Sequence, residues 1–279
     1  MGMPSASLQE IVEYRGVEGL VAAEVTHDEN DETGYTTGPV FAIAGVAEIS
    51  RTTDSSNEAH YYDNIPAVIV SNTASDEVTI SASAIPFDVL AEITGQNYDS
   101  TTGALIEGPR DFKYYALGYK TQKTNGDEVY VWRYKGTFNI PDQTNITQND
   151  GTDANGQEIV FTGISTTHKF SKTGKGAKAL NVDVAKNLAD VTNFFTTVVT
   201  PDTLQAKTAY TLTITEDEDT TVTVTRNGVE LASGAQIFSG DILVISVTGG
   251  TIQVNSAAYT SGNPMLVSGN VTVVSTATA

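Results

Sequence analysis

The sequence contains no cysteine among its 279 residues. This excludes disulfide bonds and thiolate metal sites, and it agrees with synthesis in a reducing cytosol. The sequence also has no run of about 18 apolar residues, the length that a membrane-spanning helix requires. Residues 1–10 lack the basic head and apolar centre of a secretory signal. We therefore expect neither a membrane span nor export by the general secretory route.

Basic residues are scarce: 15 Lys and Arg stand against 34 Asp and Glu, which gives a formal net charge of −19. A reader of duplex DNA needs a basic face to release counterions, so this balance argues against that class. It does not exclude a passage through which DNA slides, because a repulsive wall prevents sticking. Residues 1–111 carry 19 acidic and 3 basic residues, whereas residues 112–200 carry 8 and 10. This asymmetry suits subunits that meet head to tail, and a solvated acidic surface explains it equally well.

Signatures of catalysis and of metal binding are also missing. His27, His60 and His168 are scattered without the spacing of metal ligands, and the acidic run 216–219 is better explained as a solvated hairpin loop than as a calcium site. The basic segment 171–178 lacks the spacing of a phosphate-binding P-loop. We therefore predict a protein that is not an enzyme and that has no cofactor and no metal site.

The strongest structural signal lies at residues 114–141, where two strand-like runs flank an Asn-Gly pair at 125–126. This pair suits the positive-φ positions of a tight hairpin turn. In the second run, alternation places Tyr130, Trp132 and Tyr134 on one face. Such a stripe resembles a sugar-binding platform, but core packing within a hairpin is the better interpretation.

The rest of the chain up to residue 200 alternates between strand-like and polar segments. Strand-like runs occupy residues 8–25, 39–50, 67–85 (two strands) and 159–166, and polar loops occupy residues 26–37, 51–64 and 142–158. One short helix is predicted at 86–94, with Pro86 in its first turn and Gly95 at its end. Its apolar stripe consists of Phe87, Leu90 and either Ile93 or Ala91. A second is predicted at 186–198 from apolar residues at helical spacing.

The Thr200-Pro201 pair marks a change in composition. From residue 202 onward, Thr, Val, Ile, Gly and Ser dominate, and the pattern predicts about seven short strands with turns at 226–228, 239–241 and 249–250. This is typical of a small β-sandwich of immunoglobulin-like type. We therefore expect two domains, residues 1–200 and residues 201–279, in a mainly β protein.

Four phrases of the first domain, taken in order, resemble those of the major tail proteins of long-tailed bacteriophages. They are GPVFAIAG at 38–45, YYDN at 61–64, IPFDVLAEITG at 85–95, and ALGY through VYVWRYKG to the proline at 116–141. The resemblance covers about residues 8–200. It implies a tail-tube β-sandwich or barrel with one or two short helices, followed by an optional immunoglobulin-like decoration domain.

The same resemblance implies a structural function. Such subunits form six-membered rings whose sheets join into a β-lined channel, and the rings stack into a tube through which the genome is ejected. The implied partners are further copies of the chain, the tape measure, tail terminator and baseplate or tail-tip proteins, and DNA that passes through the lumen without specific binding. The implied location is the phage tail, with no membrane association. The resemblance favours a non-contractile tail over a tube inside a contractile sheath.

The resemblance also indicates where neighbouring copies touch. The polar loop before the YYDN phrase usually reaches a neighbour, which makes residues 51–62, together with 26–37, candidates for inter-subunit contacts. The candidate residues are Arg51, Asp54, Glu58, Tyr61, Tyr62, Asp63 and Asn64, and in a basic loop expected to dock on an acidic neighbour, Lys172, Lys175 and Lys178. Acidic side chains of residues 1–111 are expected to line the lumen.

Two other classes of protein remain as alternatives. The first is a surface protein whose C-terminal sandwich binds glycans, which predicts a monomer or trimer whose saccharide affinity is lost when residues 202–279 are removed. The second is a pilus or surface-layer protein, which the missing export signal disfavours. Self-assembly into rings or tubes of uniform width distinguishes the tail-tube hypothesis from both.

Overall fold

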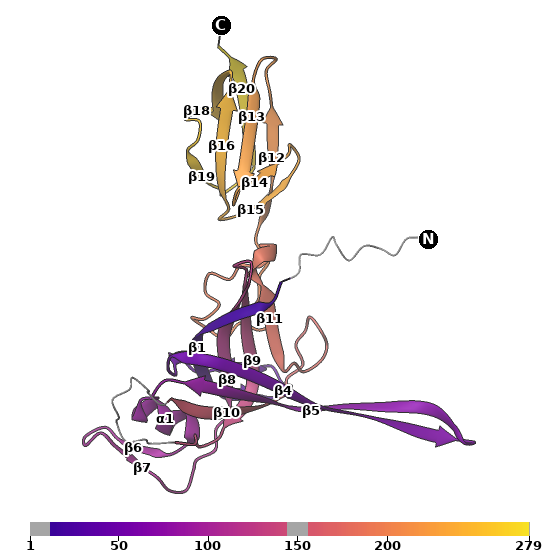
Figure 1. The fold of residues 1–279 in the computed structure, drawn as a ribbon, viewed down its shortest axis with the longest axis vertical. Coiled ribbons are helices and arrows are strands. Elements are labelled where there is room, and N and C mark those ends of the chain that lie inside the picture. Colours follow the sequence, from indigo (N-terminus) through magenta and orange to yellow (C-terminus); the bar gives the residue numbers. More distant parts are fainter. Residues whose placement is uncertain (1–11, 144–155, 279) are drawn as a thin grey trace, which may run out of the picture. The chain divides into compact units, whose positions relative to one another are not determined.

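The computed structural model describes residues 12–143 and 156–278. The chain divides into two compact units, of which the second consists of residues 187–190 together with 205–279, and the remainder forms the first. Strands dominate both units (Figure 1), so the mainly β fold class is confirmed. Among the described residues, α1 is the single α-helix.

The elements of the first unit are β1 (Tyr14–Asp28), β2 (Tyr35–Thr37), β3 (Phe41–Ala42), β4 (Val46–Tyr62), β5 (Ile65–Ala82), α1 (Phe87–Thr94), β6 (Asn97–Asp99), β7 (Ala104–Ile106), β8 (Tyr115–Lys123), β9 (Glu128–Phe138), β10 (Gln157–Ile164), β11 (Ala179–Asp183) and the 3-10 helix η2 (Val184–Lys186). Those of the second are β12 (Ala209–Thr215), β13 (Thr221–Arg226), β14 (Val229–Leu231), β15 (Gln236–Phe238), β16 (Ile242–Thr248), β17 (Gly250–Val254), β18 (Ala257–Tyr259), β19 (Pro264–Leu266) and β20 (Val271–Ala277).

One antiparallel sheet organises the first unit. Its strand order is β2-β1-β8-β9-β10-β5-β4, with β3 against β1 and β11 against β9. β9 lies at the centre because it pairs with β8 on one edge and with β11 and then β10 on the other. A central strand is buried on both faces when both faces of the sheet are covered. Accordingly, Val131 on one face is 4% exposed and Trp132 on the other is 0% exposed.

The main hydrophobic core lies against the Val131 face. It contains residues from strands near both ends of the sheet order, including Leu20 of β1 and Ile80 of β5, and from the inner strand β10, which contributes Phe161. Helix α1 adds Leu90 and Ile93 to the same cluster. Burial of side chains this size supplies the main favourable free energy of folding for the unit.

Helix α1 occupies the residues predicted for it. Gly95 ends it in the left-handed conformation with φ of 71°, and a Cβ there would lie 2.0 Å from the carbonyl oxygen of Asp111. Glycine is therefore required at this position by both backbone conformation and space. One detail of the predicted apolar stripe is wrong: Phe87 is 54% exposed, because the first residue of the helix lies outside the core cluster.

The opposite face of β9 is covered by the chain that follows β10. The indole Nε1 of Trp132 donates a hydrogen bond to the carbonyl oxygen of Phe194 at 2.7 Å, and the hydroxyl of Tyr134 donates to that of Val199 at 3.1 Å. The predicted core role of Trp132 is therefore confirmed, since a buried indole needs such an acceptor and offers no platform to a sugar.

The helix predicted at residues 186–198 is wrong. The short helix η2 ends at Lys186, and residues 192–198 form successive turns. Phe194 and Phe195 are adjacent, yet both pack on Tyr130, with ring centroids 5.4 and 5.0 Å away. An α-helix separates adjacent side chains by about 100°, so it cannot bring both rings to one partner, and the threonines of this segment favour helix weakly.

The predicted hairpin of residues 114–141 is present as β8 and β9, but its turn is longer than expected. Among residues 124–127, only Gly126 has a positive φ, of 92°, and its N–H donates to the carbonyl oxygen of Lys123 at 2.9 Å. Four residues, 124–127, connect the strands, rather than a two-residue Asn-Gly turn. Asn125 instead accepts a hydrogen bond from the backbone of Asp127 through its side chain.

Two predicted segments differ because they pair with each other. The run 67–85, expected as two strands, belongs largely to the single strand β5, and the polar stretch 51–64, expected as a loop, is mostly strand β4. The two strands run antiparallel along almost their whole length. Cross-strand pairing stabilises polar β-branched residues that have no hydrophobic periodicity of their own, so pattern alone does not find such a strand.

The second unit is a sandwich of two sheets. One has the order β15-β12-β20-β17-β18 and the other β14-β13-β16-β19, and Leu212, Val224, Ile245 and Val271 lie in the core between them. Its first and last strands, β12 and β20, pair in parallel. The unit has nine strands rather than about seven, and its assignment to the immunoglobulin-like class stays a prediction.

Residues 187–190 join the second unit through backbone pairing with the residues that precede β12. Ala189 pairs with Ala206, and the Asn187 amide donates to Asp241 at 2.6 Å. The chain thus leaves the first unit, returns to it for residues 191–204, and leaves again. The final crossing follows Leu204, four residues beyond the Thr200 boundary expected from composition.

Candidate assembly interface

Strands β4 and β5 continue as an isolated hairpin beyond the rest of the sheet (Figure 1). β10 stops pairing with β5 at Asp76, whereas β4 and β5 remain paired out to Tyr62 opposite Ile65. We call residues 54–75 the hairpin arm. A two-stranded hairpin with no covering layer is marginally stable alone, and both of its edges present unpaired backbone groups. The arm therefore has the features of a segment that gains its stability from a partner.

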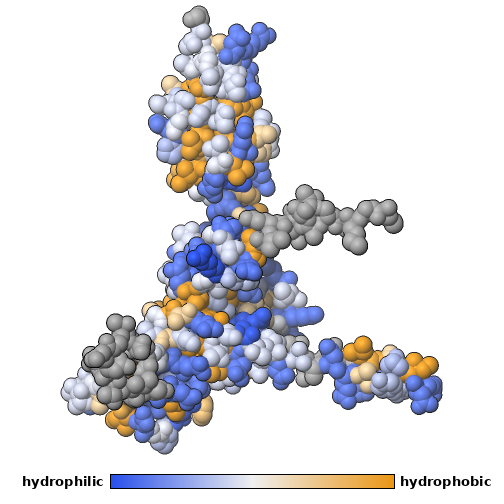
Figure 2. All heavy atoms as spheres, in the orientation of Figure 1, coloured by the Kyte–Doolittle hydropathy of each residue, from blue (hydrophilic) through white to orange (hydrophobic). Residues whose placement is uncertain are grey.

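The tip of the arm carries apolar side chains on both faces. The cross-strand register places Tyr62, Ile65 and Val68 on one face and Tyr61 and Ile69 on the other, and each is at least 50% exposed. Figure 2 shows that hydrophobic residues lie near the end of the arm. Contiguous exposed apolar groups of this kind mark interaction sites. Because both faces are apolar, full burial of the tip requires surfaces on two sides.

The tip is shaped by a two-residue turn. Asp63 and Asn64 have φ angles of 50° and 64°, which is the left-handed region that both positions of a type I′ hairpin turn require. Asp and Asn adopt this conformation more readily than other residues with side chains. These residues were selected as interface candidates from the YYDN phrase, and in the structure they fix Tyr62 opposite Ile65.

A buried ion-pair cluster holds the base of the arm. The Asp76 carboxylate accepts hydrogen bonds from Arg133 Nη1 at 2.7 Å and from Lys178 Nζ at 3.2 Å, and Arg51 Nη1 lies 3.9 Å away. Lys178 also donates to the carbonyl oxygen of Ala74. Burial opposes ionisation of Asp76, but the hydrogen bonds from Lys178 and Arg133 outweigh it and hold its pKa below the usual value. The cluster links both strands of the hairpin to the central strand.

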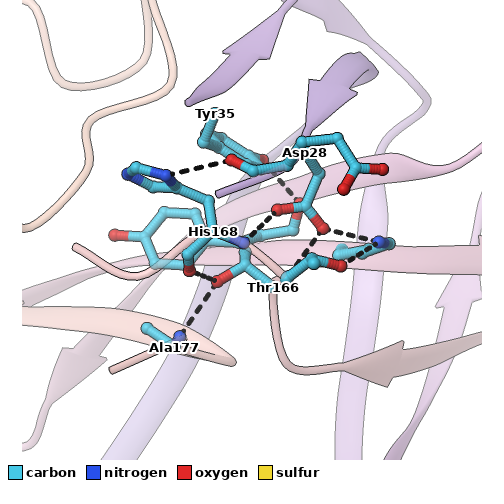
Figure 3. Close-up of polar contacts among 9 residues, drawn as sticks. Asp28, Tyr35, Thr166, His168 and Ala177 are labelled. Atoms are coloured by element: carbon cyan, nitrogen blue, oxygen red, sulfur yellow. Dashed lines mark hydrogen bonds and ion pairs between the residues drawn. The ribbon is translucent and has the colours of Figure 1, made fainter. Parts of the chain in front are cut away.

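A second buried carboxylate fixes the loop that follows β10 (Figure 3). Asp28, at the end of β1, accepts hydrogen bonds from Lys135 Nζ at 2.5 Å and from the backbone N–H groups of Thr167 and His168 at 2.8 and 2.9 Å. Burial opposes ionisation here too, and these contacts lower the pKa of Asp28. The segment 26–37, predicted as a polar loop, thus includes an anchor.

The predicted basic residues do not form one surface. Lys178 belongs to the Asp76 cluster, whereas Lys172 and Lys175 lie in a separate turn. The backbone N–H of Lys172 donates to Asp202 at 2.9 Å, and the carbonyl oxygen of Lys175 accepts from Phe170 at 3.1 Å. The turn is thus held within its own unit by Asp202. A contact of its lysines with a neighbouring copy stays a prediction.

The other predicted residues lie together on β4 and its turn. Arg51 stands at the base of the arm, and Asp54, Glu58, Tyr61, Tyr62, Asp63 and Asn64 follow along it. Sequence reasoning missed the apolar half of the tip, Ile65, Val68 and Ile69, because residues 67–85 were interpreted only as two strands and Ile65 precedes that run. The available signal was a pair of long runs on either side of the Asp63-Asn64 turn, without a third run to pair with them.

Within residues 12–143 and 156–278, no group of three or more His, Asp or Glu side chains is arranged to hold a metal ion. No helix in the described part of the chain is long and apolar enough to cross a membrane. No protein-family model matches the chain, and no curated protein matches it in sequence. The hairpin arm is therefore the feature from which function is inferred.

Proposed function

We propose that this protein is a structural subunit that assembles with copies of itself through the hairpin arm, as the tail tube of a long-tailed bacteriophage. The observation that carries self-assembly is the arm tip, where Tyr61, Tyr62, Ile65, Val68 and Ile69 are exposed on both faces of an unsupported hairpin. The assignment to a tail tube, with six-membered stacked rings, rests on the resemblance of the four sequence phrases.

The edges of the main sheet support lateral joining of subunits. β4 ends the strand order, and in the described chain its residues 46–53 pair with β5 on one edge only. β11 likewise pairs only with β9 among the described strands. Free edges are templates for strands of another chain, and contact between two different edges is heterologous, which closes a ring when the rotation permits.

The charge of the chain supports a conduit for DNA. A net charge of −19 gives a channel wall that repels the phosphate backbone, so DNA passes without binding. In this proposal the subunit acts in the virion, and it meets the tape measure, tail terminator and baseplate or tail-tip proteins at the ends and interior of the tube. A sugar platform built on Trp132 is disfavoured because this side chain is fully buried, and the alternative of glycan binding by the C-terminal sandwich stays open to test.

Assembly is tested by negative-stain electron microscopy and sedimentation velocity of the full chain across a concentration series. We expect rings or hollow tubes of uniform width from the native protein. The double variant Tyr62→Ser/Ile65→Ser should stay monomeric with an unchanged melting temperature, because these side chains touch nothing in their own subunit that folding requires. The matched control, Ile106→Ser, alters another exposed apolar residue, on β7, and should assemble normally.

Two results would contradict the proposal. If the native protein stays monomeric at every concentration, self-assembly is not an intrinsic property of the chain. If the arm double variant assembles as well as the native protein, the arm is not the assembling element. A monomer with saccharide affinity would favour the glycan-binding alternative.

A further inference from the structure

A cavity of about 530 Å³ opens in the first unit between β1, β8, β9 and the start of β4. This volume lies in the range of sites that enclose small ligands or a few side chains. The apolar side chains of its wall are Val17, Ala47, Ile49, Val129 and Val131, accompanied by Tyr14 and Tyr119. Its charged lining consists of Glu48, Arg51 and Arg133.

Positive charge is in excess beside this cavity. Arg51, Arg133 and Lys178 surround the single carboxylate of Asp76, and Glu48 is the one acidic residue of the lining. The buried Nε of Arg133 has no hydrogen-bond acceptor among the described residues. Arginines with unused donors favour a carboxylate ligand, which they bind through charge-assisted hydrogen bonds. The cavity is therefore suited to a ligand with apolar bulk and one negative charge.

The tip of the hairpin arm has this composition. Tyr61, Tyr62 and Ile65 supply apolar and aromatic bulk, and Asp63 places one carboxylate at the end of the turn. The tip is also narrow, because paired strands lie only about 4.8 Å apart.

A copy cannot place this tip in its own cavity. Arg51 in the cavity wall and Asp63 at the tip are separated by 12 residues of continuous β-strand and turn. At about 3.3 Å per residue, the tip stands roughly 40 Å from the wall from which it extends. Only the cavity of another copy is within its reach.

We propose that the cavity receives the arm tip of a second copy, with the Asp63 carboxylate beside Arg51 and with Tyr62 and Ile65 against the apolar wall. This inference rests on the proposed self-assembly and names its receiving site. The contact joins two different surfaces, tip and cavity, so each copy retains one free tip and one free cavity. Such a heterologous contact propagates into a closed ring or an open stack.

The lack of cysteine makes disulfide trapping a direct test. Ala67 near the tip and Ala47 in the cavity wall are both exposed, so each is replaced by cysteine at little structural cost. We expect a mixture of Ala67→Cys and Ala47→Cys proteins, oxidised and analysed by peptide mass spectrometry, to yield a linked 67–47 peptide pair. The control mixture combines Ala67→Cys with Ala104→Cys on exposed β7. Its yield of the linked 67–104 peptide pair should be at least tenfold lower than the yield of the 67–47 pair.

Filling the cavity provides an independent test. Ala47→Trp should raise the protein concentration required for assembly at least tenfold, whereas Ala104→Trp, the same change outside the cavity, should leave it unchanged. Asp63→Asn should weaken assembly less, because Asn keeps the left-handed turn and removes only the charge. Circular dichroism and the melting temperature verify that each variant is folded.

The outcomes separate this inference from the proposed function. If Ala47→Trp assembles normally and no 67–47 peptide pair forms, while the Tyr62→Ser/Ile65→Ser variant fails to assemble, the arm binds elsewhere and only the cavity is excluded. If the native protein never assembles, the proposed function fails. In that case the absence of the 67–47 pair at high protein concentration would exclude the cavity as well.

Discussion

Asp76 stabilises the first unit because three basic side chains from different parts of the chain converge on its carboxylate. Asp76→Asn would leave the buried Arg133 and the partly buried Lys178 without their counter-charge. We expect a loss of about 3–5 kcal/mol in the free energy of unfolding, measured by urea denaturation, because removing one partner of a buried pair strands the others. Asp54→Asn, the same change on the exposed arm, should alter it by less than about 0.5 kcal/mol. Equal effects would show that the cluster does not stabilise the fold.

The two buried carboxylates also make stability depend on pH. The pKa values of Asp28 and Asp76 are lowered from 3.8 in the folded chain, so the unfolded chain binds more protons in acid. Their contribution is therefore present above about pH 4 and is lost as the pH falls through the lower, folded values. The urea midpoint should decline steeply below about pH 4. The Asp28→Asn/Asp76→Asn variant should be less stable at neutral pH and show a shallower acid decline; an unchanged slope would assign that decline to other groups.

At the scale of elements, residues 191–204 belong to the first unit, although the composition of the sequence does not reveal where that unit ends. Its Phe194 covers Trp132, and Asp202 accepts hydrogen bonds from the backbone of Ser171 and Lys172. A boundary drawn at Thr200, where the composition changes, removes these last contacts from the unit they serve.

This placement predicts different outcomes for two truncations. A chain of residues 1–204 should fold cooperatively and keep the ability to assemble, because it retains the complete first unit and loses only the partners of residues 187–190 in the second unit. A chain of residues 1–200 should melt roughly 3–8 °C lower, since it lacks Asp202 and the Thr203 side chain that caps Thr200. Differential scanning calorimetry measures both. Identical melting temperatures would place the end of the first unit before Pro201.

Elements with a local signal were predictable from the sequence. Helix α1 has a proline start, an apolar stripe and a glycine that only the left-handed conformation suits, and the β8–β9 hairpin has alternating aromatics around a turn. The segment 186–198 misled because its apolar spacing mimics a helix, whereas its two phenylalanines are held by Tyr130, a contact from about 60 residues away. Such long-range packing leaves no trace in local periodicity.

About half of the candidate interface was predictable from the sequence. The polar strand and turn of the arm were selected through the YYDN phrase, although as a loop, because β4 lacks hydrophobic alternation and depends on β5 for its conformation. The apolar half of the tip and the cavity were not foreseen. Ile65 and Ile69 are exposed because no further described strand pairs with the arm, and the local sequence does not reveal this. The cavity is lined by residues from β1, β4, β8, β9 and β11, which no spacing rule in the sequence connects.

At the scale of the whole molecule, copies that are proposed to associate through their apolar arm tips also repel one another through their net charge. Each carries a net charge of −19, so bringing several together accumulates negative charge at distances that dilute buffer does not screen. The apolar contacts of the tip depend little on ionic strength, whereas this repulsion acts over about 10 Å at 0.1 M salt and over longer distances below it. Assembly is thus a balance between short-range attraction and long-range repulsion.

This balance predicts that salt promotes assembly. Raising the sodium chloride concentration from about 20 mM to about 300 mM should lower the protein concentration at which light scattering first rises, because screening removes repulsion among all charges and weakens only the Asp63–Arg51 attraction at the proposed contact. The Glu29→Gln/Glu32→Gln variant, which removes two exposed acids outside the arm, should assemble more readily than the native protein at low salt and equally at high salt. If salt instead dissolves the assemblies, ion pairs rather than the apolar tip hold the copies together, and the interface must be sought among the charged residues of the sheet edges.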